Sequence, residues 1–582
     1  MTVKGFPRRG DNGMTKGRET TLWRVPGWTG ESAPATAAVL ATLLIVTAVC
    51  MSTFVVHRNL IFDDSYITYR YARNLAEGHG ITWNIGEAPV EGYTNFLLVL
   101  VLAPFIRLGV DPLFATRVLS AFASVGLVFL CYRLSRKEDA DSDRSSALIA
   151  ALSFPAATQT AYLCMVGLET VLFAFAVFAA FALVRSYLKG GQEWQLAASN
   201  AVAFVAFLLR PEAAFLVLAS ALVILVPRLR GPGGMRFATR CWGLPFAVPA
   251  AFYFGWKFAH FGALLPASFY VKAGGVSWFS YSGIGSVSSF LSEVRVFIAL
   301  ALAAVALRKG MGKAEAVALL FVAFYVAFYL RVDTLMDTAG RFLYPAAVFV
   351  WYLASPAIRG VFRYLLGVEG FGPIRAFLIP AAFVLVFHGN VWADYVTVRR
   401  ALHGDDRHAD KRELMQKEYR VAQTLSRYEH IRDILIAFSD AGVIPYFTQA
   451  RFLDVVGLND RTISRERDLP TLVNYFFARR PTLVIHPANK DFTWIAYDHG
   501  PMGNYPLWSA DPRWDNYAYA GTIVTSSEYD MHLFVRRDYE RFKEFSVFLR
   551  RDVADRFYDP FRILLGTSVT RAVTPESAAV AN

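Results

Sequence analysis

Long apolar runs constrain this chain more than any other feature of its sequence. A membrane-spanning helix needs about 20 consecutive apolar residues. Eleven stretches qualify, centred near residues 46, 123, 153, 178, 203, 220, 250, 299, 322, 350 and 382. The 582 residues are 55% hydrophobic and only 18% charged, so water is a poor solvent for most of the chain. The sequence therefore predicts a polytopic α-helical membrane protein with about 11 transmembrane helices.

Basic residues in the short loops predict the orientation. The net charge is +12, but basic and acidic residues balance at 26 each from Val391 onward, so the excess lies among the apolar runs. With the N-terminus in the cytoplasm, every basic loop falls on the inner side, as the positive-inside rule requires. This distribution also argues against a nucleic-acid partner. The run Phe96–Phe105 is too short to span and would invert the pattern, so we expect an interfacial or re-entrant helix there.

This topology divides the chain into four parts. Residues 1–34 would be a cytoplasmic tail, and 35–390 the membrane domain, which begins with a retained signal anchor at Ala35–Val56 and has a first outside loop at 57–94. Residues 391–566 would form an extracytoplasmic α/β domain, with possible glycan binding, and 567–582 a disordered tail. The expected location is a bacterial inner (plasma) membrane.

The predicted α/β domain shows short β-branched and aromatic runs separated by helical stretches. Strands are expected at Ile434–Phe438, Phe452–Val456 and Leu483–Ile485, and a helix at Leu469–Arg479. An aromatic-rich segment follows, which includes Trp508 and Trp514. Its flat rings suit the faces of sugars, although they could equally pack the domain against the membrane surface.

An acidic pair, Asp63–Asp64, follows the first apolar run directly. The residues after it place Tyr66 and Arg70 on one face of a helix, so the pair would lie at the helix N-terminus. Such carboxylates can simply cap a helix. They can also act as a general base toward a sugar hydroxyl, or hold a divalent cation such as Mg, Mn or Ca against a phosphate.

Several short motifs, in this order, resemble the GT-C superfamily of glycosyltransferases. In the first loop and the membrane domain they are Asp63-Asp64, Tyr69-Arg70-Tyr71-Ala72-Arg73-Asn74-Leu75, Gly78-His79-Gly80, Asn84, Gly86-Glu87, Glu91-Gly92-Tyr93-Thr94, Gly167-Leu168-Glu169-Thr170, Arg210-Pro211-Glu212, Leu265-Pro266 with Tyr270 and Lys272, and Arg341-Phe342-Leu343 with Pro345. In the tail they are Asp440-Ala441-Gly442, Ile444-Pro445-Tyr446, Asp454 and Gly457-Leu458-Asn459-Asp460.

Within that superfamily, the chain is most similar to the bacterial arabinofuranosyltransferase B-like and pilin arabinosyltransferase branch. The resemblance implies a polyprenyl-phosphate-linked sugar donor, plausibly of arabinofuranose, and a glycan or glycoprotein acceptor on the outer face. Two departures leave the sugar and the acceptor open. Gly92-Tyr93-Thr94 replaces a more usual Ala-Asn-Thr sequence, and Arg331–Asp337 replaces a Gly-Gly-Asp-rich segment.

The resemblance and the topology together suggest roles for charged residues on the outer face. Glu169 lies at the edge of an apolar run, where an ionisable group is costly, so we expect it to act with Asp63 and Asp64. Lys272, Arg341 and Arg210 are candidates for the donor phosphate, since they are basic residues on the expected outer face and the planar guanidinium of an arginine suits phosphate oxygens. A snorkelling anchor or a helix-ending ion pair, Arg210 with Glu212, is the plainer alternative. The substrate-binding candidates are Tyr66, Arg70, His79, Glu91, Tyr93, Asp333, Trp508 and Trp514.

The predicted function is an integral-membrane glycosyltransferase. A transporter or flippase of lipid-linked glycan is the alternative, but such proteins usually show internal repeats and mid-membrane charges, which this sequence lacks. A glycan-binding scaffold is a third interpretation. No His/Cys spacing typical of a metal site and no glycine-rich nucleotide motif is present, so no cofactor is certain.

Overall fold

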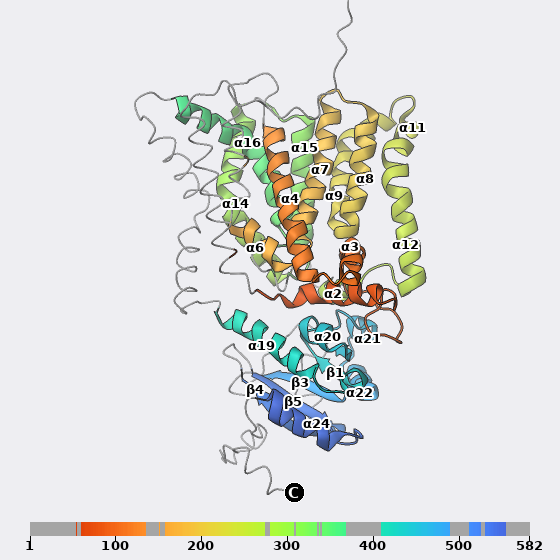
Figure 1. Ribbon diagram of the computed structural model, residues 1–582. Helices are drawn as coiled ribbons and strands as arrows, with labels where there is room; N and C mark the ends of the chain where they lie inside the picture. The colour runs from red at the N-terminus through yellow and green to blue at the C-terminus, as the bar shows by residue number, and fades with distance from the viewer. Residues whose placement is uncertain are drawn as a thin grey trace, which may run out of the picture.

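The computed structural model describes residues 54, 60–135, 151, 158–273, 280–307, 310–334, 337, 340–367, 409–488, 511–524 and 530–554. These residues form a helical bundle and a separate α/β domain, and helix α2 (Asp63–Ala76) lies across the junction between them (Figure 1). The predicted tail 1–34, most of the predicted anchor Ala35–Val56, Trp508 and the predicted tail 567–582 lie outside the described residues.

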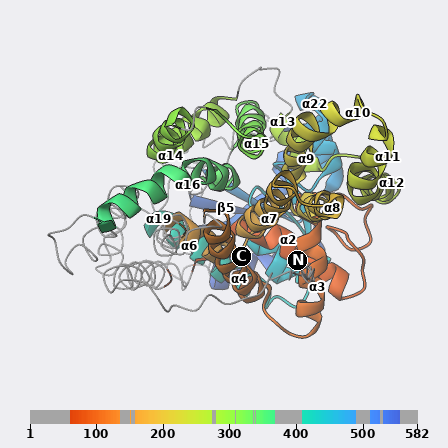
Figure 2. The ribbon, with the colours of Figure 1, turned by 90° about the horizontal axis from the view of Figure 1, so that it is seen from above.

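The bundle is built from apolar helices packed around α7, which Figure 2 shows near the centre among α4, α8, α9 and α16. The helices of this part are α3 (Phe96–Arg107), α4 (Pro112–Ser135), α6 (Thr158–Val166), α7 (Thr170–Leu188), α8 (Glu193–Leu209), α9 (Ala214–Ser220), α10 (Val226–Leu229), α11 (Gly234–Ala238), α12 (Val248–Phe261), α13 (Ala267–Ala273), α14 (Tyr281–Leu307), α15 (Lys313–Tyr329) and α16 (Tyr344–Gly367). Rings from α7 and α16 interlock in the core, with Phe178 and Phe349 centroids 5.5 Å apart.

The described helices support a membrane protein without settling the number of spans. The predicted centres near 123, 178, 203, 220, 250, 299, 322 and 350 fall within helical segments, whereas those near 46, 153 and 382 lie outside the described residues. Within the described part, four helices are long and apolar enough to cross a membrane: Pro112–Ser135, Thr170–Leu188, Pro211–Leu229 and Tyr281–Ala306. The count of eleven is therefore not confirmed.

The apolar run at Phe96–Phe105 becomes the 12-residue helix α3. At about 1.5 Å of rise per residue, it is shorter than the roughly 30 Å hydrocarbon core. It packs mainly on α2 rather than among the long helices. This agrees with the expectation that the run does not span.

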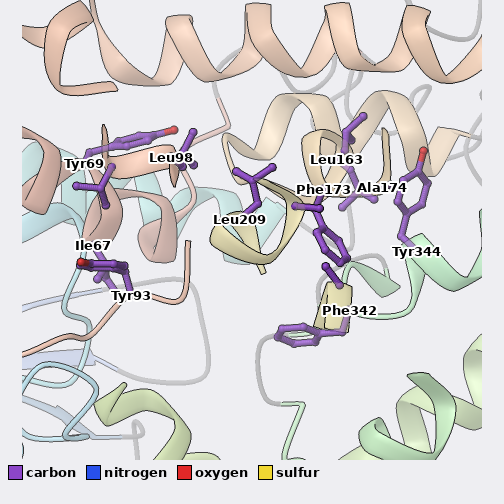
Figure 3. Close-up of a cluster of buried hydrophobic side chains, with 14 of the residues drawn as sticks. Ile67, Tyr69, Tyr93, Leu98, Leu163, Phe173, Ala174, Leu209, Phe342 and Tyr344 are labelled. Atoms are coloured by element: carbon purple, nitrogen blue, oxygen red, sulfur yellow. The ribbon is translucent and has the colours of Figure 1, made fainter. Parts of the chain in front are cut away.

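Helix α2, Asp63–Ala76, confirms the helix predicted after the first apolar run. Tyr69 and Tyr71 are fully buried, so α2 is a packed element and not a solvated loop. Figure 3 shows that the buried side chains of this region, Ile67, Tyr69, Tyr93 and Leu98, form part of a cluster of buried hydrophobic side chains that extends into the bundle. The segment around α2 is thus built into the core of the molecule.

The α/β domain contains a five-stranded sheet in the order β2-β1-β3-β5-β4. Strands β1, β2 and β3 pair in parallel, and β5 pairs antiparallel with both β3 and β4. The strands are β1 (Leu435–Phe438), β2 (Arg451–Asp454), β3 (Leu483–Ala488), β4 (Tyr517–Ile523) and β5 (Asp530–Arg536). The helices are α19 (Ala409–Leu425), α20 (Val443–Thr448), α21 (Arg461–Arg465), α22 (Leu469–Arg479) and α24 (Phe542–Phe548).

Helices cover both faces of this sheet, because successive side chains of a strand point to opposite sides. Leu435 and Ala437 of β1 pack in a cluster with α22, while Ile436 and Phe438 join the cluster that contains α19 and α24. The three predicted strands and the predicted helix Leu469–Arg479 are all present. Strands β4 and β5 were not predicted, because the aromatic segment that ends within β4 was interpreted as a sugar-binding or membrane-facing surface.

Candidate functional site

Three cations predicted from the sequence converge on one aromatic ring, that of Phe342. Their charged groups lie 5.3 Å (Arg210), 5.3 Å (Lys272) and 4.8 Å (Arg341) from its centroid. Arg210 follows α8, Lys272 belongs to α13, and Arg341 precedes α16. Figure 3 shows Phe342 next to Phe173, with Leu209, the residue before Arg210, nearby. The negative face of an aromatic ring favours cations.

Arg341 joins this cationic cluster to the acidic pair of α2. Its Nη2 lies 2.6 Å from Oδ2 of Asp64, and its guanidinium stacks 5.0 Å from the centroid of Phe62. The Nε of Arg341 is buried without a hydrogen-bond partner among the described residues. A buried, unpartnered donor on a cation favours an additional anionic ligand, since such donors are costly to leave unsatisfied.

Lys272 has the least compensated charge in the cluster. Within the described residues its ammonium forms no hydrogen bond or ion pair, and it lies over Phe342. Burial, together with the nearby charges of Arg341 and Arg210, lowers the pKa of Lys272 from its usual value. An anion placed here would reverse that effect, because a nearby negative charge favours the protonated amine.

Arg210 is already neutralised by carboxylates. Its guanidinium lies 3.5 Å from Glu169 and 2.9 Å from Glu212, and it donates to the hydroxyl of Tyr329 at 2.7 Å. Tyr329 in turn donates to Glu212. The ion pair with Glu212 that the sequence offered as the plainer alternative is therefore present. A role of Arg210 at the donor phosphate remains a prediction.

Glu169 belongs to the same network rather than to the acidic pair. Its second oxygen accepts a hydrogen bond of 2.8 Å from Asn95, whose own amide oxygen accepts from Thr68 of α2. Among the described residues, the side chain of Glu169 is thus hydrogen-bonded to Asn95 and ion-paired with Arg210. It orders the junction of α2, α3, α7 and α8, and the expectation that it acts together with Asp63 and Asp64 stays untested.

The two aspartates of α2 have different kinds of partner, namely backbone N–H groups for Asp63 and an arginine side chain for Asp64. Both carboxylate oxygens of Asp63 accept backbone N–H groups at the start of α20, from Gly442 at 2.9 Å and from Val443 at 2.6 Å. Asp63 is 6% exposed, and its burial, with the charge of Asp440 adding to it, raises its pKa well above the usual value. Asp64 points to Arg341, and its side chain is 22% exposed. Asp64 is thus the accessible member of the pair.

This arrangement does not fit a divalent cation shared by the acidic pair. Both carboxylate oxygens of Asp63 accept hydrogen bonds from backbone N–H groups, and Asp64 already accepts one from the guanidinium of Arg341. Across the described residues, no group of three or more His, Cys, Asp or Glu side chains is arranged to hold a metal ion. The structure therefore gives no support to the predicted Mg, Mn or Ca site at these residues.

Other predicted substrate-binding residues of the first loop have internal partners. Arg70 donates to the carbonyls of Trp83, Pro445 and Ala450 and to the side chain of Asn84, so the structure uses it as a buried tie between α2 and the α/β domain. Tyr66 packs edge-on against Tyr69 and Tyr446. These contacts place neither residue in the cationic cluster.

Glu91 and Tyr93 lie buried on another side of α2. Lys257 of α12 pairs with Glu91 at 2.8 Å, while burial raises the pKa of Glu91 to about 7 despite that partner. The ring of Tyr93 packs edge-on against Tyr71, with centroids 4.7 Å apart. Both side chains therefore contribute to the packing inside the junction.

The remaining predicted residues are scattered. His79 is exposed in the loop after α2, and Asp333 accepts a hydrogen bond from Ser282 and, through its backbone N–H, lies 3.4 Å from the carbonyl of Lys272. Trp514 is buried in the core of the α/β domain, stacked 4.9 Å from Tyr517. The expectation that Trp514 presents a sugar-binding surface is therefore not met, because its ring completes the hydrophobic core.

Sequence reasoning missed the residues that organise the site. Phe342 was noted only as part of a motif, although all three cations gather around it. Tyr329 and Asn95 connect the Arg210 network, and neither carries a charge that would have marked it. The position of an aromatic residue directly after Arg341 was the one available signal for Phe342.

A helical bundle joined to an α/β domain is also the fold of a solved protein that binds a polyprenyl phosphate. The fold matches that of ArnT from Cupriavidus metallidurans bound to undecaprenyl phosphate, with a TM-score of 0.50 at 12% identity over 84% of this chain and 97% of ArnT. Archaeal oligosaccharyltransferase AglB from Archaeoglobus fulgidus, in complex with an inhibitory peptide and a dolichol-phosphate, gives a TM-score of 0.48 at 14% identity, over 84% of this chain and 74% of AglB.

At the level of sequence families, residues 409–558 match a domain of unknown function, DUF8728. This match coincides with the α/β domain. No curated protein matches the chain. The likeness to ArnT confirms the fold and leaves the arabinofuranosyltransferase branch unconfirmed.

Proposed function

We propose that this chain is a membrane glycosyltransferase that transfers a sugar from a polyprenyl-phosphate carrier to an acceptor at the membrane surface. The observation that carries the proposal is the cationic cluster of Lys272, Arg341 and Arg210 around Phe342, next to Asp64. ArnT, whose fold this chain shares, was solved with undecaprenyl phosphate bound. The phosphate of such a lipid is anionic, so it would pair favourably with a cluster of basic side chains.

Lys272 and Arg341 are the residues best suited to the donor phosphate. Lys272 has no carboxylate in hydrogen-bonding contact among the described residues, and Arg341 retains a buried, unused Nε–H. Arg210 adds positive potential to the same cluster, although its own charge is paired with Glu169 and Glu212. Charge-assisted hydrogen bonds to phosphate are about twice as strong as neutral ones, so two such residues can hold the donor.

Asp64 is the residue we assign to proton transfer. Its Oδ2 is held by Arg341, and its other oxygen has no hydrogen bond among the described residues. In an inverting reaction, Asp64 would take the proton of the acceptor hydroxyl as that oxygen bonds to the anomeric carbon. As this bond forms, the bond from the anomeric carbon to the phosphate oxygen breaks, and polyprenyl phosphate leaves with the electron pair, stabilised by Lys272 and Arg341.

The finer parts of the proposal come from the sequence resemblance. The sugar would be arabinofuranose, the acceptor a cell-envelope glycan or a glycoprotein, and the location a bacterial inner membrane with the α/β domain on the outer side. Glycan binding by the α/β domain is part of the same proposal. The burial of Trp514 removes one residue that was expected to serve it.

The first experiment is binding of undecaprenyl phosphate to the purified protein, followed by transfer from a lipid-linked sugar in proteoliposomes. We expect Lys272→Ala and Arg341→Ala each to weaken binding by about tenfold or more, since each loses one charged contact of about 1.5–3 kcal/mol. Arg427→Ala, which alters an exposed arginine of the α/β domain, is the matched control.

Two results would contradict the proposal. Undecaprenyl phosphate binding that is the same in wild type and in both variants would remove the donor site. Movement of a lipid-linked sugar across the vesicle membrane without transfer to any acceptor would favour the flippase alternative.

A further inference from the structure

Three arginines of the α/β domain contact helices of the bundle, and two of them contact α13, the helix that carries Lys272. They lie on or just after α21, where Arg461 donates to the carbonyl of Phe261 at the end of α12. The guanidinium of Arg465 stacks 4.6 Å from the ring centroid of Tyr270, and Arg467 donates to the carbonyl of Tyr270 at 2.9 Å. One residue of α13 is therefore held by its ring and by its backbone.

Tyr270 and Lys272 are two residues apart on the same short helix, α13. A displacement of Tyr270 must move Lys272, because a single hydrogen-bonded helical turn includes both. On the bundle side, the backbone carbonyl of Lys272 lies 3.4 Å from the N–H of Asp333. The ammonium of Lys272 then reaches Phe342 of the cationic cluster. A continuous set of contacts thus connects α21 to the proposed donor site.

The arginines are themselves held in place by the α/β domain. Arg467 also donates to the carbonyls of Ser464 and Glu466, so contacts within its own domain hold its side chain in position. Helix α21 is capped by Asp460, whose side chain accepts from the backbone of Thr462 and Ile463. The domain therefore offers a rigid support for α13 rather than a mobile contact.

We propose that Arg465 and Arg467 are positioning residues for the donor: by holding Tyr270, they fix α13 so that Lys272 faces the donor phosphate. This inference rests on the proposed function. It gives the α/β domain a role in donor binding, which is distinct from glycan recognition. It also explains why two exposed arginines of that domain contact a helix of the other part of the molecule.

The test is a double-mutant cycle on the full-length protein in detergent micelles, with undecaprenyl phosphate as the probe. Arg465→Ala/Arg467→Ala is combined with Lys272→Ala, and Arg427→Ala serves as the control. We expect the arginine double variant to weaken binding about tenfold in the wild-type background and less than twofold in the Lys272→Ala background. Such coupling is expected only when two sets of residues act through one contact. The control should bind as the wild type does.

If the arginine double variant is poorly folded, Tyr270→Ala tests the same contact from α13. We expect it to weaken binding severalfold, again with little further effect in the Lys272→Ala background. The thermal unfolding midpoint of each variant reports whether the fold is retained.

Three outcomes would overturn the inference. If Lys272→Ala weakens binding while the arginine variants bind normally, the arginines do not position the lysine, although the proposed donor site stands. If the arginine variants weaken binding equally in both backgrounds, they act independently of Lys272. If the wild type itself fails to bind undecaprenyl phosphate, the proposed function and this inference both fail.

Discussion

At the scale of single residues, two adjacent aspartates of α2 have different structural roles. Asp63 anchors α2 to the α/β domain through two backbone N–H groups, whereas Asp64 faces Arg341 in the bundle. From sequence alone, both aspartates were candidates for the general base. Their contacts favour Asp64 for that role, because both carboxylate oxygens of Asp63 are buried and hydrogen-bonded to backbone N–H groups.

This difference predicts distinct effects of two conservative substitutions. Asp64→Asn should retain the fold and lower transfer by about 10²-fold or more, since a general base typically contributes 10²–10⁴-fold. Asp63→Asn should cost about 1–3 kcal/mol of stability, because its amide N–H₂ would face a backbone N–H and leave a buried donor unsatisfied. Transfer assays and thermal unfolding of the two variants check this. Near-normal turnover of Asp64→Asn would contradict the assignment.

At the scale of elements, residues 63–84 contact strand β2 near its start and lie at the carboxyl edge of the sheet after β1. In open α/β sheets this edge is where ligands usually bind. Here the loop after β1 receives Asp63, and Asn84 pairs through its side-chain amide with both backbone groups of Phe452 on the edge strand β2. The α/β domain therefore docks on α2 and its loop through these hydrogen bonds and through apolar contacts such as that of Tyr66 with Tyr446.

Gly442 tests this docking. A Cβ at position 442 would lie 1.8 Å from the carbonyl oxygen of Asp63, so no side chain fits without moving α2. We expect Gly442→Ala to destabilise the protein by more than about 2 kcal/mol and to lower transfer, because overpacking at a rigid contact displaces backbone. Thermal unfolding and the transfer assay measure both effects.

The matched control is Gly285→Ala on α14, where a new Cβ would meet no atom within 4 Å. It should be neutral or stabilising by about 0.5–1 kcal/mol, since alanine favours a helix over glycine. Equal behaviour of the two alanine variants would show that the contact at Gly442 does not constrain docking.

At the scale of the whole molecule, docking of the two parts should depend on pH. Glu418 of α19 is buried near Asp63 and Asp440, and burial, followed by the charges of Asp440 and Asp63, raises the pKa of Glu418 well above its usual value. The folded state then binds more protons than the unfolded state above about pH 4.5, the ordinary pKa of a glutamate. Stability therefore falls as the pH rises from that value toward the raised pKa.

We predict that Glu418→Gln flattens this dependence. The variant should have a higher unfolding midpoint than wild type at pH 8 and a smaller difference at pH 5, because it removes a buried negative charge without changing the side-chain shape. Thermal unfolding between pH 5 and 8 measures this, with Glu540→Gln on the exposed surface as the control. An unchanged slope in Glu418→Gln would contradict the prediction.

The sequence by itself determined the parts of this protein that follow from local pattern. Apolar runs of sufficient length predicted the helical bundle, and α22 and the three parallel strands follow from helical and β-branched runs. The basic residues Lys272 and Arg341 were noticed because the positive-inside rule does not explain cations on the outer side. The aromatic segment was interpreted as a surface, because an alternation of rings and polar residues is typical of a surface as well as of a buried strand such as β4.

Tertiary structure alone decided which of these residues meet. Arg210, Lys272 and Arg341 are far apart in the chain, and their convergence on Phe342 depends on how α8, α13 and α16 pack. The separation of Asp63 from Asp64 depends likewise on the docking of α20 against α2. Sequence spacing fixes directions within one helix or strand, whereas contacts between elements arise from packing, and no local pattern records them.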